Sequence, residues 1–209
     1  GVYRELGILP IKAFVHKQIL KFWTKLVIGN QSKLSAVTYR LLKTKVNAVP
    51  GNWVLKLKEL CTKYKCIEAY NDTDTHISHN NEFYNKMCRQ IDNEFTETID
   101  KEIKESPKFE IYYKITTKEL KMQDYLLYFK SSEHRRALTH LRTSAHHLEV
   151  ERGRWKRPPV PREKRICNYC EEGVVCDEIH FLLNCNKLNY QRRRWLNFLP
   201  EKTHINNVR

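Results

Sequence analysis

Residues 81–105 read NEFYNKMCRQIDNEFTETIDKEIKE. Its apolar side chains recur at four-residue steps, and they are Phe83, Met87, Ile91, Phe95, Ile99 and Ile103. Residues four apart lie on one face of an α-helix, while the opposite face here is mostly acidic. The spacing predicts a long amphipathic helix, which Ser106-Pro107 should end because proline disfavours helical backbone in the residue before it.

Similar helical patterns precede this stretch. A first helix is expected to open after Pro10 and to close at Gly29, positions that favour a helix start and a helix end. A second helix is expected to be capped by Ser32 or Ser35, and a third by Asn52, because their side-chain oxygens can accept from free backbone N–H groups. The chain has only six glycines and no Asn-Gly or Asp-Gly hairpin turn, which argues against a sheet.

The remaining segments are less regular. Residues 71–81 are polar and predict a loop. Ser131 or Ser132 is expected to cap a helix that runs to about Arg152 and ends at Gly153. A group of aromatic and apolar residues is interpreted as helix-packing core: Tyr112, Tyr113, Tyr125, Leu126, Leu127, Tyr128 and Phe129. Together these patterns predict an all-α protein, an irregular helical bundle with a small C-terminal Cys3His zinc module.

Length and composition limit the class of protein. The 209 residues are 41% hydrophobic, enough for one domain or for a helical domain with a small appended module. No stretch approaches the roughly 20 apolar residues of a membrane span, and no signal-peptide pattern is present. We therefore expect an intracellular, reducing location, in the cytoplasm and nucleus, without a membrane partner. The chain begins with Gly1, and we expect it to be a piece of a longer protein.

Charge is segregated along the chain. The net charge is +14 overall, and it is +11 over residues 1–66, −4 over residues 67–130 and +7 over residues 131–209. Two basic regions around an acidic middle predict positively charged surfaces, for which a polyanion is the natural partner. Nucleic acid is favoured, whether RNA or DNA.

The strongest chemical motif is Cys167-x2-Cys170-x9-His180-x4-Cys185. Two local pairs of soft ligands can close a tetrahedron around one zinc ion, and four protein ligands make such a site structural rather than catalytic. The alternative is a chance cluster of buried cysteines. Cys176 fits neither pair and is interpreted as a spare thiol, although it could replace Cys170 or Cys185.

Basic side chains around this motif are candidates for binding nucleic acid. They lie on the helix expected after residue 131, in a proline-rich stretch and after the zinc motif, and some are beside tryptophans that can stack on bases. For the helix after residue 131, a solvated face is an equal alternative. For residues 191–195, the alternative is a basic helix end with one core tryptophan. The candidates are Arg135, Arg136, Arg142, Arg154, Trp155, Lys156, Arg157, Arg192, Arg193 and Arg194.

These features divide the chain into three expected parts. Residues 1–153 form a helical domain, residues 154–166 a basic proline-rich linker, and residues 167–209 the zinc module with its Arg-rich tail. No phosphate loop, nucleophile elbow or paired aspartates occur, so we expect no catalysis by this chain itself. His146-His147 is interpreted as one packed and one exposed histidine.

Three parts of the sequence resemble a known family. They are Leu141–Arg154, the zinc motif with its ending DEIHFLLNC over residues 177–185, and the opening YRELGILP over residues 3–10. They are similar to the C-terminal region of reverse transcriptases from non-LTR (LINE-type) retrotransposons of invertebrate animals. The family usually has an acidic residue where this chain has Cys176.

The resemblance implies a helical thumb-like and linker region followed by a CCHC zinc motif. By position it assigns Cys167, Cys170, His180 and Cys185 as zinc ligands. It implies that the chain holds template RNA or target DNA while an upstream polymerase domain of the same polyprotein copies RNA into DNA. The alternatives are a zinc-stabilised protein-interaction module of a domesticated element, and a decayed fragment without activity.

Overall fold

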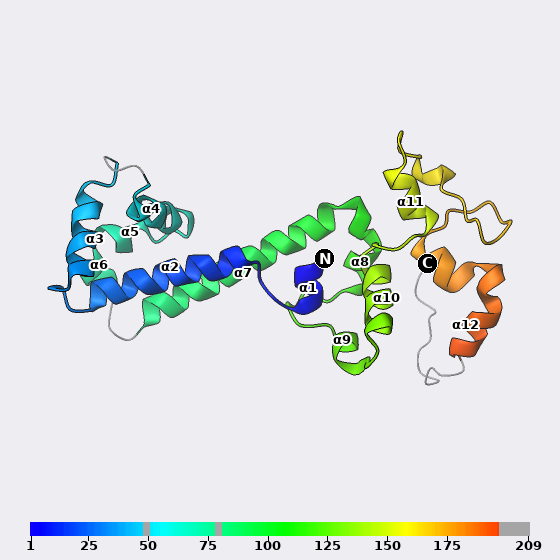
Figure 1. Cartoon of the computed structure of the whole chain (residues 1–209), viewed down its shortest axis with the longest axis horizontal. Helices are drawn as coiled ribbons and strands as arrows, with labels where there is room; N and C mark the ends of the chain where they lie inside the picture. The colour runs from blue at the N-terminus through cyan, green and yellow to red at the C-terminus, as the bar shows by residue number, and fades with distance from the viewer. Residues whose placement is uncertain (48–50, 78–80, 197–209) are drawn as a thin grey trace. The chain divides into compact units, whose positions relative to one another are not determined.

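A computed structural model describes residues 1–47, 51–77 and 81–196 (Figure 1). The chain divides into two compact units. The N-terminal unit consists of residues 2–105 and 117–123, and the C-terminal unit of residue 1, residues 106–116 and the chain from residue 124. Over the described residues the structure contains helices and no strand, which confirms the predicted all-α class. No helix in this part is long and apolar enough to span a bilayer.

The N-terminal unit is built around two long helices that run side by side in opposite directions, α2 and α7 (Figure 1). Shorter helices pack around the C-terminal half of α2. The elements are α1 (Val2–Leu6), α2 (Ile11–Ile28), α3 (Leu34–Thr44), α4 (Trp53–Lys63), α5 (Ile67–Asn71), α6 (Thr73–His76) and α7 (Glu82–Glu105).

Apolar burial holds this unit together. Leu57 of α4 and Ile91 of α7 are completely buried, as is Trp23 of α2, whose indole N–H donates to the Tyr39 hydroxyl at 2.9 Å. The predicted helix over 81–105 is present as α7, with Met87, Ile91, Ile99 and Ile103 buried along one face. Burial of this stripe stabilises the unit by roughly 25 cal/mol per Å² of apolar surface removed from water.

The helix ends agree with the predictions in part. Gly29 ends α2, and the Asn52 side chain accepts from the Val54 N–H at 3.0 Å at the start of α4. The predicted serine cap of α3 is wrong, because Lys33 precedes the helix and the Ser32 hydroxyl donates to Asn30 Oδ1 instead.

The loop prediction for residues 71–81 is also wrong in part, since the described part contains α6 and a buried Ile77. An apolar side chain at residue 77 lets this polar segment pack onto the core. Residues 78–80 of this segment lie outside the described part, as do residues 48–50.

Residues 117–123 join the N-terminal unit through a close backbone approach. Leu6 and Met122 form an isolated antiparallel bridge, and the Gln123 N–H donates to the Glu5 carbonyl at 3.0 Å. Gly7 has φ +63°, and a Cβ there would lie 2.2 Å from the Met122 nitrogen. Only glycine allows both this backbone conformation and this contact.

The C-terminal unit consists of short elements. Ser131 precedes its longest described helix and accepts from the His134 N–H at 3.4 Å, as predicted. The elements are η1 (Pro107–Phe109), α8 (Glu110–Ile115), α9 (Asp124–Tyr128), α10 (Ser132–Arg142), α11 (Glu149–Trp155), η2 (Arg162–Lys164), η3 (His180–Asn184), η4 (Asn186–Leu188) and α12 (Asn189–Leu196).

The single helix expected from residue 131 to 152 is wrong, because the chain turns between α10 and α11. Ser144 has φ +50°, and the Ala145 N–H donates to the His140 carbonyl at 2.7 Å. The Ser144 N–H donates to the Leu141 carbonyl, which completes a Schellman helix end. Gly153 lies inside α11 rather than at its end, and a Cβ there would lie 2.7 Å from Arg165 Cγ.

The predicted aromatic core is largely wrong. Tyr112 is buried, but Leu127 and Tyr128 are 65% and 78% exposed. The Arg142 guanidinium lies over the Tyr112 and Tyr125 rings, at 5.8 and 5.3 Å from their centroids. These rings therefore contact a cation rather than form an apolar core.

Residues 154–166 pack against the unit instead of separating two domains. The Val160 N–H donates to the Gly153 carbonyl, and the Arg165 guanidinium donates to the carbonyls of Val160 and Val150 at 2.8 and 2.7 Å. Leu148 and Val150, which the sequence placed in the helical domain, belong to the same buried cluster as Cys167, Cys170, Cys176 and Cys185. The chain passes between the compact units after residues 105, 116 and 123, and not at residues 154–166.

Candidate metal centre

A short hairpin positions the first two cysteines. Ile166 and Val175 form an antiparallel bridge, and the Cys167 N–H donates to the Val174 carbonyl at 2.9 Å. Gly173, with φ +67°, turns the chain before residue 174. The hairpin therefore presents Cys167 and Cys170 from one tight turn, as the two-residue gap between them requires.

A π-helical turn positions the other two candidates. The Cys185 N–H donates to the His180 carbonyl at 2.7 Å, so the five-residue hydrogen-bonded ring of η3 spans both ligands. Asp177 begins this turn, since its Oδ1 accepts from the His180 N–H at 2.8 Å. The gap of four residues between His180 and Cys185 thus matches the wider π turn.

The two pairs meet in one buried group. One ligand atom from each of Cys167, Cys170, His180 and Cys185 lies within 4.8 Å of the other three, and all four residues are buried. The Cys170 Sγ and the His180 Nε2 are 3.4 Å apart. Zinc–sulfur bonds of about 2.3 Å in a tetrahedron give ligand–ligand separations of roughly 3.8 Å. These four residues could hold a metal ion, as the spacing predicted.

Local polarity distinguishes Cys167 from Cys176. Burial raises the pKa of Cys167, but the Tyr169 and Cys170 N–H groups and hydrogen bonds from His180 outweigh burial and bring this pKa to about 7. Burial raises the pKa of Cys176 to about 12. Cys176 lies outside the group of four, as expected for a spare thiol, and packs beside Leu148 and Val150.

The buried carboxylate of Glu178 lies two residues before the candidate ligand His180 in the sequence. Glu178 Oε1 accepts from the Ser144 hydroxyl at 2.7 Å and lies 2.9 Å from His146 Nε2. Burial raises the pKa of Glu178, but the hydrogen bonds from His146 and Ser144 outweigh burial and lower it. His146 is packed here, with its side chain 9% exposed, and His147 is exposed, which is the arrangement predicted for this pair.

This network was not predicted, although the sequence contains its parts in Ser144, His146 and Glu178. It connects the turn after α10 to the residue two positions before the ligand His180. The left-handed Ser144 is explained by it, because glycine would fit the backbone but could not donate to Glu178.

Arg192 has an internal role that the sequence analysis missed. Its guanidinium donates to the Leu182 and Cys185 carbonyls, both at 2.8 Å. These carbonyls lie at the end of the ligand-bearing turn, and the Cys185 carbonyl also accepts from the Leu188 N–H at 3.2 Å. Arg192 therefore stabilises the metal centre, and this part of its side chain is occupied.

The other candidate basic residues fall into two groups. Arg135 donates to the Phe129 carbonyl at 3.0 Å, Arg154 pairs with Glu151 at 3.0 Å, and Arg142 lies over aromatic rings. The second group is exposed to solvent, and it comprises Arg136, Trp155, Lys156, Arg157, Arg193 and Arg194.

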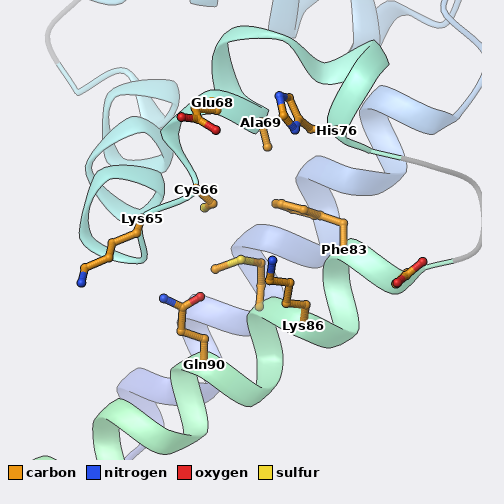
Figure 2. Close-up of a pocket in the computed structure, with 10 residues that line it drawn as sticks. Lys65, Cys66, Glu68, Ala69, His76, Phe83, Lys86 and Gln90 are labelled. Atoms are coloured by element: carbon orange, nitrogen blue, oxygen red, sulfur yellow. The ribbon is translucent and has the colours of Figure 1, made fainter.

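A separate cavity of about 290 Å³ lies in the N-terminal unit between α5, α6 and the start of α7 (Figure 2). Figure 2 shows the Cys66 thiol and the Phe83 ring on its walls, with His76 above them. A hydrogen bond from the Cys61 thiol lowers the pKa of Cys66, against the effect of burial. The cavity groups carry no metal-ligand arrangement among the described residues.

Comparison with protein-family models, with curated proteins and with solved structures finds no match for this chain.

Proposed function

We propose that the chain is a nucleic-acid-binding, zinc-containing segment of a LINE-type retrotransposon reverse transcriptase. The observation that carries the proposal is the convergence of Cys167, Cys170, His180 and Cys185 within 4.8 Å, in a unit that also has exposed cations. The family is proposed from the sequence resemblance at the zinc motif, at residues 141–154 and at residues 3–10.

Zinc is the metal proposed for the four ligands. Three thiolates and one imidazole in a closed group suit its preference for soft ligands and tetrahedral geometry. When bound, zinc supplies folding energy rather than reaction chemistry, because four protein ligands leave no open position. The protein's own contribution is to orient the ligands through Asp177 and to hold the backbone of the turn through Arg192.

The proposed nucleic-acid surface belongs to the C-terminal unit. Exposed Arg157, Arg193 and Arg194 can neutralise phosphates, and Trp155 is 73% exposed and can stack on a base. The chemistry of RNA-directed DNA synthesis would belong to an upstream polymerase domain, and this segment would position template RNA or target DNA.

The test is fluorescence anisotropy of the zinc-loaded chain with a hairpin RNA and a DNA duplex across a salt series. Each phosphate contact contributes about −0.9 to the slope of log K against log salt on duplex DNA. The variant Arg157→Ala/Arg193→Ala/Arg194→Ala should weaken binding at least tenfold and reduce that slope. The matched control Lys21→Ala/Lys25→Ala/Lys33→Ala removes the same charge from exposed positions of the N-terminal unit. Equal effects of both variants, or binding indifferent to salt, would contradict the proposal.

A protein-interaction role is the second candidate, and the exposed Leu127 and Tyr128 favour it. Apolar side chains at such exposure are typical of surfaces that a partner covers. This role would be supported by loss of a protein partner in Leu127→Ser/Tyr128→Ser, with nucleic-acid binding absent in the unaltered chain.

A further inference from the structure

The C-terminal unit contains a cleft of about 470 Å³ that neither the metal centre nor the basic tail accounts for. Its volume is in the range of pockets that hold small organic ligands, about 300 to 1,000 Å³. All of its residues belong to this one unit, and they are Lys108, Ser144, Ala145, His146, His147, Glu151, Arg152, Trp155 and Lys156.

The rim of the cleft combines an aromatic face with positive charge. Trp155 is 73% exposed, and Arg152 and Lys156 are also exposed beside it on or just after α11. Lys108 of η1 also lines the cleft and adds an ammonium group. A flat ring surrounded by cations fits a stacked base whose phosphates contact the rim.

The wall of the cleft contains an unusual acceptor. Glu151 is 3% exposed, and its Oε1 pairs with Arg154 at 3.0 Å. Its Oε2 is buried without a hydrogen-bond partner among the residues that the structure describes. A buried carboxylate oxygen without a donor is costly, so a ligand N–H that reaches it gains a charge-assisted hydrogen bond.

We infer that this cleft binds one base of a single-stranded nucleic acid, with the ring on Trp155 and an exocyclic amino group donating to Glu151 Oε2. Cytosine presents such an amino group on its Watson–Crick edge. Uracil presents one N–H between two carbonyl oxygens, which a carboxylate repels. The inference rests on the proposed function and adds a base preference at a defined position.

The rigid part of the cleft depends on the metal centre. Ser144 and His146, which line the cleft, both bond Glu178, and Glu178 stands two residues before the ligand His180. The base preference should therefore require the metal-loaded protein, while phosphate contacts through exposed cations should depend on it less.

The experiment measures binding of the zinc-loaded full chain to oligocytidylate and oligouridylate about ten nucleotides long, a length within the usual site sizes for single strands. The expected result is binding about tenfold tighter to oligocytidylate, the scale of one charge-assisted hydrogen bond. An oligomer of N4,N4-dimethylcytidine, which lacks the amino hydrogens, should bind as weakly as oligouridylate.

Protein variants separate the acceptor from the rim. Glu151→Gln should make the affinities for oligocytidylate and oligouridylate equal. Arg152→Ala should weaken binding of both oligomers by the same factor. Trp155→Ala should weaken binding of both oligomers about tenfold. Trp155→Phe should keep most of the affinity, because it still offers a ring for stacking. The dimethylcytidine probe needs no substitution, so it remains decisive if Glu151→Gln fails to fold.

The outcomes separate this inference from the proposed function. Equal binding of all three oligomers by the unaltered chain would overturn the cleft and leave nucleic-acid binding intact. If the chain binds none of the oligomers and also binds no hairpin or duplex, both the cleft and the proposed function would be overturned. A preference for oligocytidylate that the dimethylated probe shares would also overturn the role of Glu151.

Discussion

The two units are held together in different ways. In the N-terminal unit, side chains such as Leu57, Ile91 and Trp23 are completely buried, and the helices contribute a continuous apolar core. In the C-terminal unit, the described buried cluster consists of four cysteines, Leu148 and Val150, and a polar network surrounds it. We therefore expect the first unit to fold by apolar burial alone, and we propose that the second depends on a metal ion that joins its four ligands.

Removal of the metal should produce the largest difference between the units. Structural zinc contributes on the order of 10 kcal/mol to folding of small sites. Cys185→Ser, or chelation, should abolish hydrogen-exchange protection in residues 144–188 while α2 and α7 keep theirs. Cys88→Ser is the matched control, since this cysteine lies on α7 outside the ligand group. Equal loss in both units would break the distinction.

A core truncation should give the reverse pattern. Leu57→Ala removes a completely buried side chain and should destabilise the N-terminal unit by about 2 to 5 kcal/mol. Zinc content should not change. Leu55→Ala, on the same helix but 39% exposed, should cost far less. Chemical denaturation followed by amide exchange would measure both, and a loss of zinc in Leu57→Ala would show that the units fold together.

Glu178→Gln should weaken the C-terminal unit by a smaller amount, about 1 to 3 kcal/mol, because buried groups lose a charge-assisted partner. Substitution of residues that support metal ligands typically lowers metal affinity 10- to 100-fold. Competition with a chromophoric chelator would measure this effect. Glu171→Gln, an exposed glutamate in the same module, should leave the affinity unchanged.

The smallest effect concerns acid sensitivity of the N-terminal unit. Burial, with the positive charges of Lys63 and Lys12, lowers the pKa of His16 below its ordinary value of 6.5. The folded state therefore binds fewer protons than the unfolded state, and stability is lost as the pH falls below 6.5. His16→Asn should lose less stability than the unaltered chain between about pH 7 and pH 5. The exposed His147→Asn should behave as the unaltered chain does.

Local spacing predicted the features that depend on a few neighbouring residues. The four-residue repeat of α7 and the cap at Asn52 were confirmed, and the Cys and His positions converge as their spacing indicated. Each of these depends on periodicity or on a short turn.

The errors arose where a distant residue decides the local structure. Ser144 adopts a left-handed conformation that sequence patterns reserve for glycine, and its partner Glu178 is 34 residues away. The internal hydrogen bonds of Arg192 were missed for a similar reason, because its backbone acceptors at Leu182 and Cys185 are set by how the turn folds and not by side-chain identity. The unpaired Glu151 Oε2 depends in the same way on tertiary packing.

The most direct test of the central claim is metal analysis of the purified chain, with cobalt(II) replacing the native metal. We expect one metal ion per chain and the absorption spectrum of a tetrahedral cobalt site with three thiolates and one imidazole. Cys170→Ser should alter that absorption, and Cys176→Ser should leave it unchanged. A folded C-terminal unit without bound metal, or a spectrum that depends on Cys176, would contradict the account.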